Sequence, residues 1–192
     1  MSTERQIEII ETSIFLIAEK GIQGLTIKNI SKKIGISEPA IYRHFDSKTE
    51  ILIAILNNFK DMGEMLTGMV QSNNDTAIEK IKFMFLKIID MFIDQPALIS
   101  VIFSEEIFKN EDVLKNKIVD ILNMHQANIE SILALGKIEK NVRTDIETPS
   151  LALIVMGSLR LLVKRWELNN QNFNLRIEGA KLIQSIKQII KL

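Results

Sequence analysis

Apolar residues recur along most of the chain every three or four positions, the spacing that gathers them on one face of an α-helix. Ile7, Ile10, Ile14 and Ile17 form the first of these stripes. Capping residues, glycines and prolines divide the pattern into about nine helices, which begin near residues 3, 26, 37, 47, 76, 96, 110, 148 and 174. Runs of β-branched residues between turn signals are missing, so the sequence predicts an all-α protein.

Several helix ends are marked by residues that satisfy free backbone groups. Thr3 with Gln6, and Ser47 with Glu50, have the spacing of a capping box, in which each side chain accepts a hydrogen bond from the other residue's backbone N–H. Gly35 follows the second helix, where a left-handed C-terminal residue is expected. These signals predict the ends of the first, second and fourth helices.

The later helices are predicted from their own breaks. Pro96 begins a sixth helix that is expected to run through Phe108, and Asn110 caps a seventh that extends to about Leu135. The segment LALIVMGSLRLLV, from Leu151, is interrupted by polar residues and is shorter than the ~20 apolar residues that span a bilayer. We interpret it as a buried helix and expect no membrane partner.

The composition is that of a globular chain of one or two domains. Of 192 residues, 46% are hydrophobic and 25% are charged, which is enough to build a core. The chain has no cysteine, which excludes disulfides and thiolate metal sites and fits a reducing compartment. Acidic residues occupy the N-terminal positions where a secretory signal would be basic and then apolar. We therefore expect a cytoplasmic protein without a metal site or a cofactor.

Charge is distributed unevenly although its sum is zero. Between Thr26 and Lys48 there are five basic residues and two acidic ones, a local net charge of +3. Residues 51–192 carry 17 bases and 17 acids and offer no field for phosphate groups. The basic stretch is compatible with nucleic-acid binding, and equally with ordinary solvated lysines.

The segment GISEPAIYRHFDSK, residues 35–48, is unusually polar and aromatic for so short a stretch. It joins two short helices by a Gly-Ile-Ser turn, which is a helix-turn-helix. Ile41 and Phe45 are four residues apart and are expected to anchor the second of these helices inward. The residues left to face outward or sideways, where such a helix meets the major groove, are Glu38, Pro39, Tyr42, Arg43 and His44.

The longer segment GLTIKNISKKIGISEPAIYRHFDSKTEIL, Gly24 to Leu52, resembles the DNA-binding segment of TetR-type transcriptional regulators. The resemblance rests on the threonine that opens the second helix, the glycine–aliphatic–serine turn, the run YRHF, and the serine–lysine pair that opens the fourth helix. Ser31 and Ile34 stand where the family usually has alanines. The bulkier Ile34 is expected to shift the packing of the two helices slightly.

The resemblance implies a homodimer whose subunits have a three-helix DNA-binding domain, residues 1–48, and a larger helical domain, residues 49–192, for effector binding and dimerisation. By motif position it implies phosphate contacts from Thr26, Lys28, Tyr42, His44 and Lys48. It implies that Glu38, Pro39, Ala40 and Arg43 face bases, next to Ser37 at the start of the same helix. Glu38 would then accept from a cytosine amino group and Arg43 would donate to guanine.

The larger domain is rich in methionine and phenylalanine, which suit an adaptable apolar cavity and equally suit an ordinary core. If a cavity exists, we expect an apolar or amphipathic ligand such as a fatty-acyl or aromatic compound. The candidate pocket residues are Met62, Met65, Phe85, Phe92, Phe103, Met124 and His125.

The last two helices carry more apolar surface than two terminal helices bury in a small subunit. We therefore predict that they pair with a second copy in a four-helix bundle, with Trp166 at its edge. The predicted interface residues are Leu151, Ile154, Val155, Leu159, Leu162, Leu182, Ile183, Ile186 and Ile190.

Together with these patterns, the resemblance implies a ligand-responsive transcriptional regulator, a repressor that binds a palindromic operator as a dimer and is released by a small effector. The mechanism we expect is that ligand tilts the fourth helix and changes the spacing of the two recognition helices. The alternative is a DNA-bound interaction protein whose larger domain docks a protein partner. A helical enzyme is disfavoured because the chain has no G-x-S-x-G, H-E-x-x-H or phosphate-loop motif.

Overall fold

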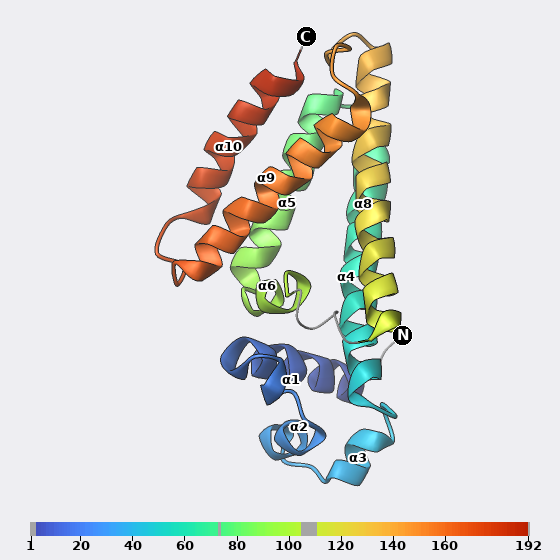
Figure 1. Cartoon of the computed structure of the whole chain (residues 1–192), viewed down its shortest axis with the longest axis vertical. Helices are drawn as coiled ribbons and strands as arrows, with labels where there is room; N and C mark the ends of the chain where they lie inside the picture. The colour runs from blue at the N-terminus through green and yellow to red at the C-terminus, as the bar shows by residue number, and fades with distance from the viewer. Residues whose placement is uncertain (1–2, 73, 105–110, 192) are drawn as a thin grey trace. The chain divides into compact units, whose positions relative to one another are not determined.

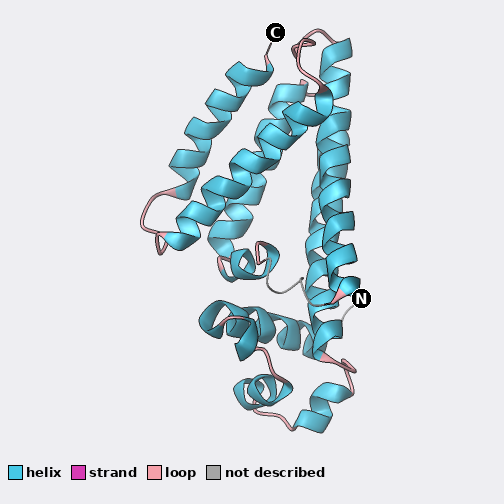
Figure 2. Ribbon diagram, viewed as in Figure 1, coloured by secondary structure: helices cyan, strands magenta, loops and turns pink. Residues whose placement is uncertain are grey.

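The computed structural model describes residues 3–72, 74–104 and 111–191. Within these ranges every regular element is a helix, with nine α-helices, one short 3-10 helix and no strand (Figure 1, Figure 2). The all-α prediction is therefore confirmed. The helices are α1 (Glu4–Lys20), η1 (Ile22–Gly24), α2 (Ile27–Ile34), α3 (Glu38–Tyr42), α4 (Lys48–Gln71), α5 (Ala77–Asp94), α6 (Ala97–Ile102), α8 (Asp112–Ile138), α9 (Thr148–Leu168) and α10 (Leu175–Ile190).

The predicted helix starts agree with these bounds within a few residues. The differences are at the C-terminal ends of the sixth and seventh predicted helices. The sixth helix stops at Ile102, and the rest of its predicted span, with Phe108 and the Asn110 cap, lies largely outside the described residues. The seventh predicted helix, α8, continues through Gly136 to Ile138 rather than ending near Leu135. Gly136 packs closely against Val142 and Ala77, so it serves a contact inside the helix and does not end it.

The predicted capping box of α1 is present and that of α4 is half formed, whereas the Ser37 side chain, a further predicted cap, makes no capping bond to α3. Thr3 Oγ1 accepts from the Gln6 backbone N–H at 3.2 Å, and the Gln6 side chain accepts from the Thr3 N–H at 2.9 Å, which completes the capping box. Ser47 Oγ likewise accepts from the Glu50 N–H at 3.2 Å. The Glu50 carboxylate, however, accepts from the N–H of Asp46, one residue earlier than the capping box requires.

The chain forms two compact units, which we call unit 1 (Met1–Asp61 and Ala97–Asp120) and unit 2 (Met62–Pro96 and Ile121–Leu192). Helices α4 and α8 each contribute one part to unit 1 and one part to unit 2. The functional division predicted between residues 48 and 49 stays a prediction.

In unit 1, α1 packs against α2, η1 and α6, and α2 packs against α3. The side chains at the centre of this unit are fully or almost fully buried: Ile9, Leu16, Leu25, Ile30, Ile41, Ile51 and Val101. Ser13 is buried among them and donates to the Ile9 carbonyl at 2.7 Å, so its hydroxyl is satisfied inside its own helix.

In unit 2, α10 packs on α5 and α9. Gly179 in α10 lies so close to Ile89 in α5 that a methyl group there would overlap the isoleucine side chain. Trp166, predicted at the edge of a dimer bundle, is instead buried within the protomer, where its indole N–H donates to the Phe173 carbonyl at 2.9 Å. A tryptophan this deep anchors the turn between α9 and α10.

The unit 2 parts of α4 and α8 lie side by side (Figure 1). They meet through small and polar residues. Gly63 faces the His125 ring closely enough that a methyl group would overlap it. One turn further on, Thr67 Oγ1 accepts from the Asn128 side-chain amide at 3.0 Å and donates to the Gly63 carbonyl at 2.9 Å. Burial also lowers the pKa of His125, which favours the neutral imidazole in this contact.

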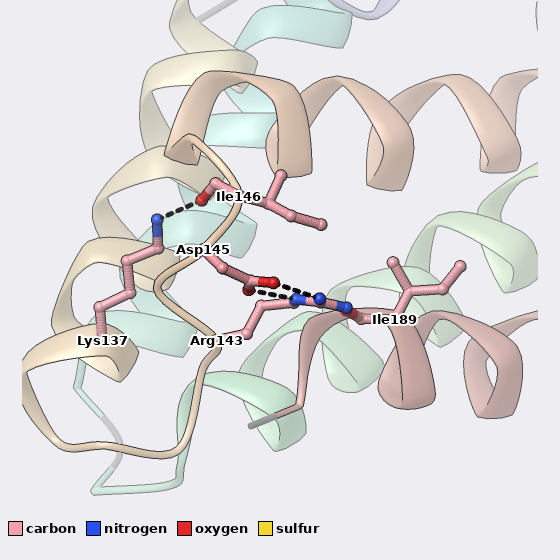
Figure 3. Close-up of polar contacts among 5 residues, drawn as sticks. All are labelled: Lys137, Arg143, Asp145, Ile146 and Ile189. Atoms are coloured by element: carbon pink, nitrogen blue, oxygen red, sulfur yellow. Dashed lines mark hydrogen bonds and ion pairs between the residues drawn. The ribbon is translucent and has the colours of Figure 1, made fainter.

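The loop between α8 and α9 holds the C-terminal end of α10 (Figure 3). The Arg143 backbone N–H donates to the Ile190 carbonyl at 2.9 Å, and its guanidinium donates to the Ile189 carbonyl at 3.2 Å. The same guanidinium donates two bonds to Asp145, at 2.7 and 2.6 Å. A cation and two donors thus meet the carbonyl end of the helix, where the helix dipole favours positive charge.

None of the helices in the described ranges combines the length and the apolar character needed to cross a membrane. The apolar segment that begins at Leu151 lies in α9, and Leu151, Val155 and Val163 are buried there. Leu153 and Leu161 of the same helix remain exposed.

Candidate nucleic-acid interface

Helix α2 begins with a capped, exposed N-terminus. Thr26 is exposed, and its hydroxyl accepts from the Asn29 backbone N–H at 3.1 Å. The Asn29 side chain in turn donates to the Gly24 carbonyl at 2.9 Å and fixes the preceding turn. Lys28, in the first turn of α2, is also exposed, so a cation accompanies the N–H groups that an anion would meet.

The turn between α2 and α3 is closed by backbone hydrogen bonds. Gly35 has φ 80° and ψ 31°, the left-handed conformation predicted for it. The N–H groups of Gly35 and Ile36 both donate to the Ser31 carbonyl, at 2.9 and 3.0 Å. Ser31 itself is buried, so the small side chain at this position allows the helices to approach.

Helix α3 is five residues long and is held from one side only. Ile41 is fully buried and Phe45 is 7% exposed, so both point inward as predicted. On the other side, Ser37, Glu38, Pro39 and Arg43 are exposed, Tyr42 leaves 49% of its surface to solvent, and Ala40 and His44 are half-buried. Ser37 precedes the helix without a side-chain capping bond, so its hydroxyl is available to a partner.

Helix α4 begins a few residues after α3 in the sequence. Ser47 is half-buried and caps α4, whereas Lys48 is exposed at its first position. Gln6 of α1 donates from its side chain to the His44 carbonyl at 3.5 Å and so links α1 to the end of the recognition segment. Sequence reasoning did not identify this support, because Gln6 already had a role in capping α1.

All ten residues predicted to contact DNA belong to unit 1, and none has its side chain fully buried. Not every basic residue of this stretch points freely to solvent, because the Lys33 ammonium lies over the Phe15 ring, 4.2 Å from its centroid. The arrangement offers exposed cations, hydroxyls and one aromatic ring around a short exposed helix. It is suited to a phosphate backbone and to groove edges.

The predicted effector residues are placed differently from one another. Phe85 and Phe92 are 2% exposed in the core of unit 2, whereas Met62 and Met65 on α4 are 40% and 64% exposed. Met124 and His125 are half-buried on α8, and Phe103 is half-buried in unit 1. Their common role in a ligand site stays a prediction.

Two hollows of unit 2 lie elsewhere. One, with room for about 20 Å³, is lined by α5 and α10 residues that include Ile78, Ile81 and Ile183. The other is a shallow surface next to Arg143 and Asp145. None of the seven predicted effector residues lines either hollow. In the described part of the chain no group of three or more histidine and acidic side chains is placed to hold a metal ion.

Most of the residues predicted for the dimer interface lie on the inner faces of α9 and α10. Six of them are buried inside the protomer and so are not available to a partner: Leu151, Val155, Leu159, Ile183, Ile186 and Ile190. Leu162 and Leu182 are half-buried, and Ile154 is 41% exposed. The apolar residues that α9 and α10 leave exposed are instead Leu153, Ile154, Leu161, Leu168, Ile177 and Ile189. Because α9 is apolar on several faces, its periodicity did not distinguish the inner face from the outer one.

The chain matches two family descriptions. Residues 9–55 match bacterial regulatory proteins of the tetR family, and residues 75–192 match the C-terminal region of MAATS-type transcriptional repressors. The first match contains the helix-turn-helix, and the second covers most of unit 2.

Individual relatives include a metabolic regulator and a nucleoid occlusion factor. The fatty acid metabolism regulator protein of Bacillus subtilis is 24% identical over 174 residues, which cover 89% of this chain and 88% of that protein. The nucleoid occlusion factor SlmA of Actinobacillus pleuropneumoniae is 25% identical over 141 residues, which cover 71% of this chain and 68% of that protein.

Solved structures share the fold. The transcriptional regulator FadR from Bacillus subtilis, in complex with stearoyl-CoA, superposes with a TM-score of 0.82 at 21% sequence identity, covering 94% of this chain and 96% of that one. Since both parts of the sequence match regulator families and the arrangement of helices is shared, this chain belongs to the tetR family of bacterial transcriptional regulators.

Proposed function

We propose that α3 is the recognition helix of a homodimeric repressor, and that it enters the major groove of operator DNA with Glu38, Pro39, Ala40 and Arg43 toward the base edges. The observation that carries this proposal is the one-sided burial of α3. Ile41 and Phe45 fix the helix from within, while the opposite side chains stay exposed without a core of their own. A short helix held in this way presents its N-terminal residues as a helix-turn-helix requires.

The surrounding residues are suited to phosphate groups. Thr26 and Lys28 stand at the start of α2, and Lys48 at the start of α4, where exposed N–H groups and positive charge coincide. Tyr42 and His44 flank the recognition helix from its C-terminal side. In this proposal these five residues fix the register on the duplex, and base contacts supply the sequence preference.

The proposed effector is an amphipathic molecule with a long acyl chain. The support comes from the apolar, methionine-rich composition of unit 2 and from the fatty acid metabolism regulator, which is similar to this chain over most of its length. The related FadR structure contains stearoyl-CoA. The proposed contacts are the predicted effector residues that belong to unit 2, namely Met62, Met65, Phe85, Phe92, Met124 and His125.

Release would act through α4. This helix begins at Lys48, a proposed phosphate contact, and its later turns belong to unit 2, where Gly63 and Thr67 meet α8. A ligand that binds better when α4 is tilted would shift the protein toward a form with lower operator affinity. The size of this shift is set by the difference between the ligand's affinities for the two forms. The chain would act on DNA as a regulator and not as an enzyme, in the cytoplasm where a bacterial chromosome lies.

A competing function is docking of a protein partner by unit 2. The similarity to nucleoid occlusion factors is compatible with it, and with one of them it extends over 97% of this chain, so coverage does not separate the two functions. Buried Phe85 and Phe92 fit either function.

The test of DNA binding begins with duplexes selected from a random pool by the purified protein. The selected duplexes are expected to share a two-fold symmetric sequence. The wild type should bind this sequence, and the Arg43→Ala variant should not. Retention of all selected sequences by the Arg43→Ala variant would contradict base contact by α3. Lys20→Ala, which removes a cation from the end of α1, is the matched control.

The test of the effector is a titration of the operator complex with acyl-CoA thioesters of increasing chain length and with free CoA. Long-chain thioesters are expected to release the DNA, whereas free CoA leaves it bound. No release by any thioester, at concentrations that saturate binding to the protein, would contradict the proposed effector and favour the protein-docking function.

A further inference from the structure

The chain has eight glycines, and they differ in whether backbone conformation or lack of space requires glycine at the position. Gly21 and Gly35 have φ values of +69° and +80°, which other residues rarely adopt. Four more face an atom of this chain that a methyl group would overlap or crowd: Gly24, Gly63, Gly136 and Gly179. Gly68 and Gly157 have neither reason, since nothing lies within 4 Å of the place where a Cβ would stand.

Gly157 occupies the middle of α9 and is exposed to solvent. A glycine in a helix interior weakens the helix, so the position needs a reason that the protomer alone does not contain. Leu153 lies four residues before it and Leu161 four residues after it, and these side chains are 64% and 62% exposed. Ile154 adds a further apolar side chain, 41% exposed, on the same side of the helix.

This pattern is self-complementary. A two-fold axis through Gly157, perpendicular to α9, would bring Leu161 of one copy next to Leu153 of the other and would leave glycine at the crossing point. An isologous contact requires such symmetry, because the same patch serves both partners. Gly68 on α4 lacks this symmetric spacing. Its exposed apolar neighbours are Met65, three residues before it, and Met69, one residue after it.

We propose that Gly157 is the point at which α9 of one protomer crosses α9 of a second copy, an inference that rests on the proposed homodimer. The missing side chain lets the two helices approach to the short end of the 8–10 Å range of helix packing. Leu153, Ile154 and Leu161 then fill the space on both sides of the crossing. The glycine thereby fixes the distance between the two protomers.

The absence of native cysteines allows a direct test. In Gly157→Cys the Cα atoms of the two new cysteines would be about 4.4–6.8 Å apart, which is the separation that a disulfide accepts. Mild oxidation of the full-length protein is expected to give a covalent dimer at least about ten times faster than for Gly68→Cys, the matched exposed helical glycine. Equal rates, or a faster reaction of Gly68→Cys, would overturn the inference.

Bulk at the crossing point gives a second measurement. Gly157→Leu is expected to raise the dimer dissociation constant by about tenfold or more in sedimentation equilibrium, and Gly68→Leu to leave it within about twofold. Circular dichroism establishes that both variants retain their helices. A Gly157→Leu protein that dimerises like the wild type overturns the inference.

The wild type separates this inference from the proposed function. If the unmodified protein is a dimer that binds a symmetric duplex, while Gly157→Cys fails to cross-link, the crossing point is wrong and the proposed function stands. If the unmodified protein is monomeric, both fail.

Discussion

Tyr42 directly follows a fully buried residue, Ile41, and yet leaves 49% of its own surface exposed. A tyrosine at this position has no core to fill, and its ring and hydroxyl face solvent at the end of α3. An exposed aromatic residue on an element this short contributes little to folding. Its proposed contribution is to DNA binding, through a hydrogen bond from the phenolic hydroxyl to a phosphate oxygen.

Replacing Tyr42 therefore separates binding from stability. Tyr42→Phe removes only the hydroxyl and is expected to weaken operator binding by about fivefold, whereas Tyr42→Ala weakens it by about tenfold or more. The free energy of unfolding should change by no more than ~0.5 kcal/mol. Gel shifts and urea melts measure the two effects. Unchanged operator affinity of the Tyr42→Ala variant would be incompatible with the proposed contact.

Two glycines of α4 allow a matched comparison of packing. In Gly63→Ala the new methyl group overlaps the His125 ring, so the ring must shift, and we expect the variant to lose about 1–3 kcal/mol of stability. In Gly68→Ala the methyl group meets no neighbour, so helix propensity should stabilise the protein by about 0.5–1 kcal/mol. Thermal melts of both variants test the pair. Stabilisation of both variants would disprove the close contact between Gly63 of α4 and His125 of α8.

At the scale of elements, α10 is held at its end by a loop rather than only by its apolar face. Arg143 donates to the last carbonyls of α10 and is itself oriented by Asp145 (Figure 3). The hydrogen bonds and charge of Arg143 lower the pKa of the Asp145 carboxyl from 3.8 to about 2. The contact with Arg143 thus favours the ionised form of the Asp145 carboxyl.

The pH dependence follows from the direction of this shift. Because the folded-state pKa is depressed, the carboxylate stabilises the fold above pH 3.8, and the effect is lost as the pH falls toward about 2. Asp145→Asn should thus be less stable than the wild type near pH 6, and the difference should narrow below about pH 4. Urea midpoints across this range measure it.

The control variant for net charge is Asp61→Asn, which removes a carboxylate from an exposed position of α4. A stability difference for Asp145→Asn that stays constant from pH 6 to about pH 3 would show that ionisation of Asp145 contributes nothing to the fold.

The elements differ in how far the sequence determines them. The end of α2 and the inward face of α3 were predictable, because Gly35 and the pair Ile41 and Phe45 express local geometry. The outer face of α9 was not predictable, because its leucines occur on several sides and only tertiary packing distinguishes Leu151 from Leu153. A ligand site is harder still to predict, since buried Phe85 and exposed Met65 share one hydropathic class.

At the scale of the whole molecule, a neutral chain is proposed to bind a polyanion through a few local cations. With Lys28 and Lys48 from each of two protomers on phosphates, four counterions would be released, and the logarithm of operator affinity should fall with the logarithm of salt concentration with a slope of about −3.6. Lys48→Gln should reduce that slope by about 2, because each copy loses one contact. Lys164→Gln, on α9, should leave the slope unchanged.

Binding of one duplex by two recognition helices is best tested by a hydroxyl-radical footprint of the wild-type protein on its selected duplex, with the mass of the complex determined by sedimentation. We expect two protomers on one duplex and two protected half-sites related by a two-fold axis, with centres about 34–36 Å apart or a multiple of that spacing. A monomer with no salt-sensitive affinity for any duplex would contradict it.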